Sequence, residues 1–166
     1  MKSLFLIAIL FSSFNALACT YTTSTTTEST YEIIRQARNG SRVSLCVDNK
    51  KFYDFELENM LEAGVRLRIL MSQVDYYTFQ LENFAKKGSV LIDMGRKKMY
   101  TFEMENLLEA GADIRLSSRH ANLYSFEVLK LAKASPGRLI LVLDDDRYYD
   151  HEIRQFREAG VRVVIR

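Results

Sequence analysis

Hydrophobic and polar positions repeat along this chain with a period of about 24 residues. Each repeat has an aromatic residue near its start, an apolar helical stripe and a glycine that ends the helix. In residues 100–111, for example, Tyr100, Met104, Leu107 and Leu108 fall on one face of a helix, and Gly111 supplies the left-handed stop. The helical part of the pattern occurs six times, at residues 29–40, 53–64, 77–88, 100–111, 124–137 and 149–160.

A short apolar strand follows each glycine. The six predicted strands cover residues 42–47, 65–70, 89–94, 112–116, 138–143 and 161–165. Helix and strand in regular alternation indicate parallel strands joined by right-handed crossovers. The predicted fold is therefore α/β: six tandem βα units of about 24 residues that form a solenoid-like parallel sheet.

Two coverings of this sheet are compatible with the pattern. Arg66, Arg68 and Arg115 alternate with apolar residues, which favours a sheet with all helices on one face. The strands around Val90 and Leu139 are apolar on both faces, which favours a doubly covered, three-layer α/β/α sheet. We prefer the one-sided sheet and keep the covered sheet as the alternative.

Each helix start carries a residue with good capping chemistry. Asp54, Thr78, Thr101, Ser125 and Asp150 are the predicted N-caps, each followed two residues later by an acid or amide that suits the helix N-terminus. An aromatic ring or His151 stands next to each of these caps. Phe102 and its equivalents lie off the apolar stripe, so we expect them to pack on the neighbouring helix or under the capping loop.

The first 18 residues have the features of a signal peptide. Lys2 precedes an apolar run at residues 4–11, and Ala16-Leu17-Ala18 forms a small-x-small cleavage site. The predicted product is exported, periplasmic or secreted, and has no transmembrane segment. Cleavage would leave Cys19 first, where a lipid anchor is the less favoured alternative because Ala16 stands where lipoproteins usually carry leucine. Residues 19–30 are rich in threonine and are expected to be a flexible lead, followed by one α/β repeat domain over residues 31–166.

Composition limits the classes of partner. A formal net charge of +2 over 166 residues gives no general attraction to nucleic acid, so no nucleic-acid partner is expected. The only two cysteines, Cys19 and Cys46, are a candidate disulfide in an oxidising compartment, although Cys46 could equally be a small buried apolar residue.

Candidate binding residues follow the strands, where parallel sheets usually hold ligands. Lys97, Lys98 and Arg119, together with Lys50, Lys51 and Arg96, form a basic rim, and Arg66, Arg68 and Arg115 make the second sheet face cationic. Asp144 and Asp146 are weak candidates for a divalent cation site. Solvated loop charge is the simpler explanation for these loops. No cofactor is predicted, and His120 is the only candidate general base.

The double unit built on Val43-Ser44-Leu45-Cys46-Val47-Asp48 and Leu61-Glu62-Ala63-Gly64 resembles the βαβ segment of phospholipase D-like proteins. In that family a His-x-Lys motif and an aspartate act on phosphodiesters. Here His120-Ala121-Asn122 and Glu127 stand at those positions, with asparagine in place of lysine. The resemblance implies a degenerate phosphodiesterase centred on His120. The function that we favour is a non-enzymatic module that binds a protein, a glycan or another polymer.

Overall fold

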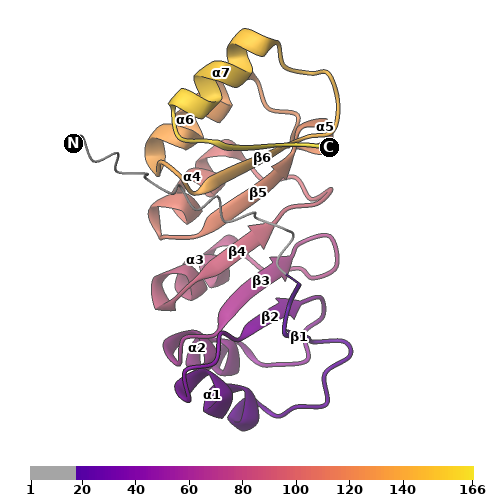
Figure 1. Cartoon of the computed structure of the whole chain (residues 1–166), viewed down its shortest axis with the longest axis vertical. Helices are drawn as coiled ribbons and strands as arrows, with labels where there is room; N and C mark the ends of the chain where they lie inside the picture. Colours follow the sequence, from indigo (N-terminus) through magenta and orange to yellow (C-terminus); the bar gives the residue numbers. More distant parts are fainter. Residues whose placement is uncertain (1–17) are drawn as a thin grey trace, which may run out of the picture.

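A computed structural model describes residues 18–166, and its framework is one seven-stranded sheet. The strands stand side by side in sequence order, and every neighbouring pair is parallel (Figure 1). They are β1 Tyr21–Thr22, β2 Ser44–Val47, β3 Arg66–Leu70, β4 Val90–Asp93, β5 Asp113–Ser117, β6 Leu139–Leu143 and β7 Arg162–Ile165. The predicted α/β class with parallel strands and repeating βα units is confirmed.

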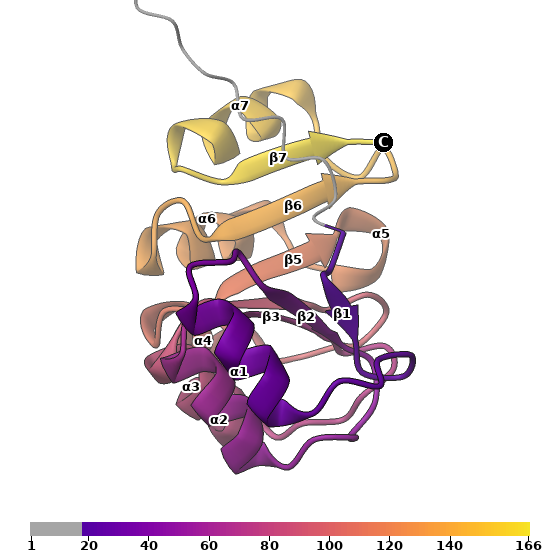
Figure 2. The same cartoon turned by 60° about the horizontal axis from the view of Figure 1, so that its bottom comes forward.

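The helices form a single row beside the sheet. They are α1 Thr30–Arg38, α2 Asp54–Glu62, α3 Thr78–Lys87, α4 Thr101–Glu109, α5 Ser118–Ala121, α6 Ser125–Ala134 and α7 Asp150–Glu158. Except for the one-turn α5, each helix contacts the next one along the chain. Figure 2 shows these helices on the same side of the sheet. The other face of β3–β5 carries charged side chains: Arg66 is exposed, whereas Arg68, Asp93 and Arg115 are largely shielded by one another and by their neighbours.

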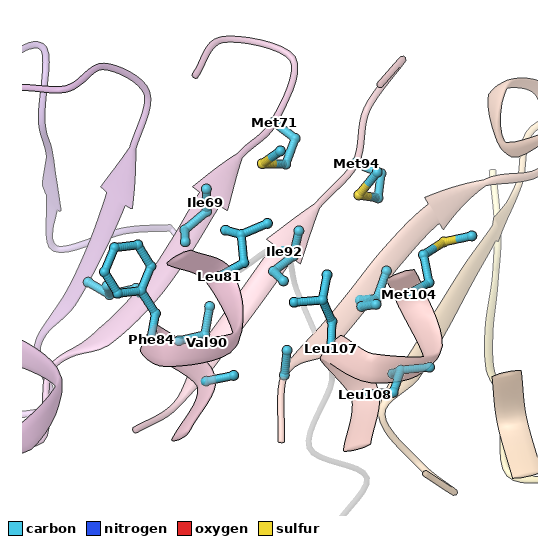
Figure 3. Packing of buried hydrophobic residues seen from close by; sticks show 14 of the residues in the cluster. Ile69, Met71, Leu81, Phe84, Val90, Ile92, Met94, Met104, Leu107 and Leu108 are labelled. Atoms are coloured by element: carbon cyan, nitrogen blue, oxygen red, sulfur yellow. The ribbon is translucent and has the colours of Figure 1, made fainter. Parts of the chain in front are cut away.

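The core lies between the helix row and one face of the sheet. Strand residues that face the helices alternate with residues of the open face, so Leu67 and Ile69 are buried while Arg66 is exposed. Figure 3 shows Phe84 of α3 and Leu107 of α4 packed over the strands, with Leu107 next to Ile92. All three of these side chains are fully buried. One continuous apolar cluster runs from Ile33 to Val161.

The helix starts differ from the prediction by one residue. The N-caps are Tyr53, Tyr77, Tyr100, Tyr124 and Tyr149, and the expected caps occupy the first helical position instead. At α4 the Tyr100 N–H donates to the Glu103 carboxylate at 3.0 Å, and the Glu103 N–H donates to the Tyr100 carbonyl at 3.0 Å. The acid at the third helical position thus reaches back to cap the helix, which leaves the cap residue's own side chain free.

The residues that were predicted as N-caps form hydrogen bonds between neighbouring helices instead. Hydroxyls at the first helical position donate to the acid at the third position of the next helix: Thr30 to Glu56 (2.5 Å), Thr78 to Glu103 (2.8 Å), Thr101 to Glu127 (2.8 Å) and Ser125 to Glu152. The hydrogen bond from Ser125 and the backbone N–H of Tyr149 lower the pKa of Glu152. One step is reversed, because Gln80 donates its amide to Asp54 at 2.5 Å.

The aromatic rings at the helix starts are exposed, which the sequence did not predict. Phe102 and its equivalents pack neither on a neighbouring helix nor under a loop; they are exposed and stack on the tyrosine two residues earlier. Tyr100, expected on the buried stripe, is exposed as well. Tyr100 is exposed because a cap residue lies outside the helical turns whose stripe faces the sheet, and Phe102 is exposed because it lies off that stripe.

The threonine-rich lead is not a free tether. Tyr21–Thr22 forms β1 and pairs in parallel with β2. Cys19 and Cys46 form a disulfide with their Cα atoms 5.6 Å apart. The buried Thr23 hydroxyl donates to Asp48 at 2.6 Å. The strand pairing, the disulfide and the Thr23–Asp48 hydrogen bond thus order a segment that its threonine-rich composition predicted to be flexible.

The predicted signal peptide falls almost wholly in residues 1–17, outside the described residues. Over the part of the chain that the structure describes, no helix has the length and apolar character needed to cross a membrane.

Candidate functional site

The candidate site is a cavity of about 380 Å³ on the open face of the sheet, over the carboxyl ends of β3–β6. Its wall includes cationic, hydroxyl and acidic side chains from four strands and the loops that follow them. The lining residues that carry charge or a ring nitrogen are Arg68, Asp93, Arg96, Arg115, His120, Asp144 and Arg166. Five of these residues, Arg68, Arg96, Arg115, His120 and Asp144, were separate candidates in the sequence, and the fold brings them together.

An ion-paired triad crosses the floor of this cavity. The Asp93 carboxylate accepts from Nη2 of Arg68 at 2.5 Å and lies 3.5 Å from Nη1 of Arg115. Asp93 and Arg115 are register partners across β4 and β5, and Arg68 reaches them from β3. All three side chains are largely shielded from solvent. One carboxylate shared between two guanidinium groups leaves a net positive charge.

Hydrogen-bond donors remain available in the triad. Each guanidinium carries five N–H donors, and Asp93 engages few of them. Within the described residues, Nε of Arg68 is buried and has no hydrogen-bond partner. Arg96 adds an exposed guanidinium at the rim. Partly desolvated arginine donors of this kind suit carboxylate, sulfate and phosphate groups, whose oxygens they bind in pairs.

His120 enters the cavity because α5 interrupts the repeat. The Ser117 hydroxyl caps this single turn by accepting the His120 N–H at 3.3 Å, and Asn122 ends it in a left-handed conformation. The sequence indicated only a loop at residues 117–120. The imidazole is partly exposed and shares the cavity wall with Arg115.

Asp144 fixes α5 and is not free to act as a metal ligand. Its carboxylate accepts from the hydroxyls of Ser117 (2.6 Å) and Ser118 (2.9 Å) and from the N–H of Arg119 (3.0 Å). Burial raises the pKa of Asp144, but these hydrogen bonds outweigh it and bring that pKa down to about 2. Thr23 and Asp48 repeat the arrangement at β1 and β2, which marks it as a structural motif of the strand ends.

Gly95 allows two loops of the wall to approach closely. Its φ of +51° lies in the left-handed region, and a Cβ at this position would stand 3.0 Å from Cβ of Ser72. A larger residue would separate the loops after β3 and β4 and change the rim of the cavity.

The other predicted site residues lie outside the cavity. Arg66 is exposed near the start of β3, and Lys98 and Asp146 are exposed in loops. Lys97 pairs with Asp75 at 2.6 Å beside a second, shallower depression. The Arg119 side chain donates to the Asp144 carbonyl at 2.7 Å. No cluster of three metal-ligating side chains occurs among the described residues.

Asp93 and Arg166 are cavity residues that the sequence analysis did not single out. Asp93 could have been found, because it alternates with Ile92 and so points to the open face beside Arg115. Arg166 gave no such signal, since it follows the last strand.

Comparison with known proteins does not assign this chain to a family. No family model matches the chain, and no curated protein matches it. Among solved structures, an aldolase designated QR15 is 16% identical with a TM-score of 0.37, over 82% of this chain and 74% of the aldolase. A protein of Coccidioides immitis described as a candidate fructose-1,6-biphosphate aldolase is 15% identical with a TM-score of 0.29, over 87% of this chain and 71% of that one. Likeness at this level carries neither a fold nor an activity to this chain.

Proposed function

We propose that this chain is an exported, non-enzymatic α/β repeat protein that binds a protein or polymer ligand through an anionic group. In this proposal the six βα units of about 24 residues form a one-sided, solenoid-like scaffold whose open strand face is the binding surface. The observation that carries the proposal is the convergence of Arg68, Arg96 and Arg115 in one cavity on that face. The Cys19–Cys46 disulfide supports export, because such bridges persist in oxidising compartments.

The charge of the cavity favours an anion over other ligands. Four arginines line it against two aspartates, and Asp144 is already held by hydroxyl and N–H donors. Asp93 keeps Arg68 and Arg115 in place, so their donors are ordered before a ligand arrives. Pre-ordering of this kind reduces the entropy cost of binding.

Titration of the full chain with inorganic phosphate and with sulfate, followed by calorimetry or NMR, tests this proposal. Arg115→Gln removes a charged donor and is expected to weaken anion binding at least tenfold, which corresponds to about 1.4 kcal/mol. Arg66→Gln is the matched control, because Arg66 lies on the same face outside the cavity. Equal weakening in both variants, or no saturable binding by the unmodified protein, would reject the cavity as the binding site.

A degenerate phospholipase D-like phosphodiesterase is the second candidate, favoured by one observation: His120 lines the same anion-binding cavity. Against it, Asn122 stands where the family has lysine, and its side chain accepts from Nη1 of Arg147 at 2.8 Å. Hydrolysis of an activated phosphodiester by the unmodified protein, lost in His120→Ala, would support this candidate over the non-enzymatic one. Anion binding without turnover in either protein would support the first.

A further inference from the structure

A row of exposed aromatic side chains lies along the helix N-termini, and none of them lines the cavity. We call it the aromatic row: Tyr31, Tyr53, Phe55, Tyr77, Phe79, Tyr100, Phe102, Tyr124, Phe126, Tyr149 and His151. In five successive repeats the cap tyrosine and the ring two residues later stack nearly parallel, with ring centroids 5.7–5.9 Å apart. The tyrosines and phenylalanines of the row are 60–75% exposed.

Folding does not account for these rings. A cap tyrosine contributes only its backbone N–H and carbonyl to the capping contacts, as Tyr100 does with Glu103. In the first repeat the cap is Ser29, whose hydroxyl accepts the Glu32 N–H at 3.3 Å. Serine therefore suffices as a cap in this fold. Five repeats nevertheless carry an exposed tyrosine there.

The area of the row is that of a protein interface. A fully buried aromatic side chain removes roughly 150–250 Å² from solvent, so ten rings at the observed exposure present about 1,000–1,700 Å². Monomeric soluble proteins seldom expose continuous apolar patches above a few hundred Å². A stable complex of standard size buries about 800 Å² on each partner. The row exceeds both values.

From this we propose that the aromatic row is the contact between two copies of this chain, related by a two-fold axis near Tyr100 and Phe102. Theirs is the third of the five stacked pairs, so rotation about that axis sets the first pair against the fifth and the second against the fourth. A regular row is self-complementary in this arrangement, because the rings of one copy can lie between those of the other.

The polar groups beside the row allow it to be covered. The acids at the third position of α2, α4, α6 and α7 each accept a backbone N–H and a hydroxyl from the previous helix. Covering the row leaves none of these four acids without hydrogen bonds, and the helix N-termini favour their negative charge. None of the rings lines the cavity, so this contact uses no cavity residue.

Sedimentation velocity over a concentration series of the full chain tests this inference. The unmodified protein is expected to form a concentration-dependent dimer, and Tyr100→Ser with Phe102→Ser is expected to weaken dimerisation at least tenfold. Both side chains are exposed, so the thermal midpoint of the variant reports whether the fold is retained. Ile165→Ser is the control: this side chain is 71% exposed on the edge strand β7, away from the row.

The outcomes separate the possible occupants of the row. A dimer that is lost in the double variant and kept in Ile165→Ser supports the inference. A protein that is monomeric at every concentration, or a dimer unchanged in the double variant, overturns it. A monomer that binds phospholipid vesicles or an insoluble glycan through Tyr100 and Phe102 also overturns it, since the row would then have a different occupant.

Discussion

Two buried tyrosines in equivalent repeats differ by one hydrogen bond. Tyr76 and Tyr148 each precede a cap tyrosine and pack edge-on against Phe84 and Phe156, with ring centroids 5.5 and 5.0 Å apart. Burial raises the pKa of both hydroxyls to about 12. The Tyr148 hydroxyl donates to the Leu123 carbonyl at 2.8 Å. Among the described residues the Tyr76 hydroxyl has no partner.

This difference predicts opposite effects of the same substitution. Tyr148→Phe removes a buried hydrogen bond and is expected to lower the free energy of unfolding by about 1–2 kcal/mol. Tyr76→Phe removes a buried hydroxyl that has no partner and is expected to be neutral or stabilising. Urea unfolding of both variants measures the difference, and equal losses would contradict the assignment. The two variants control for each other because both keep the ring.

At the scale of the elements, the helices are joined by a polar ladder along their N-termini. At four of the five steps a hydroxyl at the first helical position meets an acid in the next helix, and at the remaining step, between α2 and α3, Asp54 meets the amide of Gln80. Donor and acceptor change places at this step. An acid on both sides would set two carboxylates against each other.

Gln80→Glu is therefore expected to destabilise the protein by about 1–2 kcal/mol, through a lost hydrogen bond and carboxylate repulsion. Adding Asp54→Thr recreates the pairing of the other steps and is expected to restore stability to within about 0.5 kcal/mol. Thermal and urea unfolding of the single and double variants give the coupling energy. Gln155→Glu is the control, because this substitution adds the same charge at an exposed position. A double variant no more stable than Gln80→Glu would refute the ladder.

The elements could be predicted from the sequence wherever the repeat itself carries the signal. Regular glycines and branched strand residues indicated six helices and six strands, and the structure has them. The helix starts were placed one residue late because threonine is a better cap than tyrosine by preference alone. The contact that decides the cap is the return of Glu103 to the Tyr100 N–H, together with the use of Thr101 by the next helix.

The seventh strand and the site needed contacts between distant residues. Composition makes residues 19–30 a disordered lead, and what orders them is the Cys19–Cys46 disulfide and the Thr23–Asp48 hydrogen bond. Arg68 and Arg115 could be assigned to the open face by alternation. Their meeting with His120 in one cavity depends on α5, and α5 depends on hydrogen bonds to Asp144 across 25 or more residues.

At the scale of the whole molecule, contacts are almost entirely between neighbouring repeats. The main helix–helix contacts of each long helix are with the helices before and after it, and the strands pair in sequence order. In a linear array of this kind, stability depends on each repeat and on its interfaces with its neighbours. A repeat in the middle has two such interfaces, and the last repeat has one.

This arrangement predicts that the position of a core substitution along the array decides which part of the chain unfolds. Phe84 in α3 and Phe156 in α7 are fully buried and equivalent, and each Phe→Ala change is expected to cost about 3–5 kcal/mol locally. Phe84→Ala weakens interfaces on both sides, so amide exchange should rise throughout the sheet. Phe156→Ala should raise exchange in α7 and β7 and leave β2–β5 protected. Hydrogen exchange with mass spectrometry distinguishes these patterns, and a uniform rise in both variants would mean that the repeats unfold as one cooperative unit.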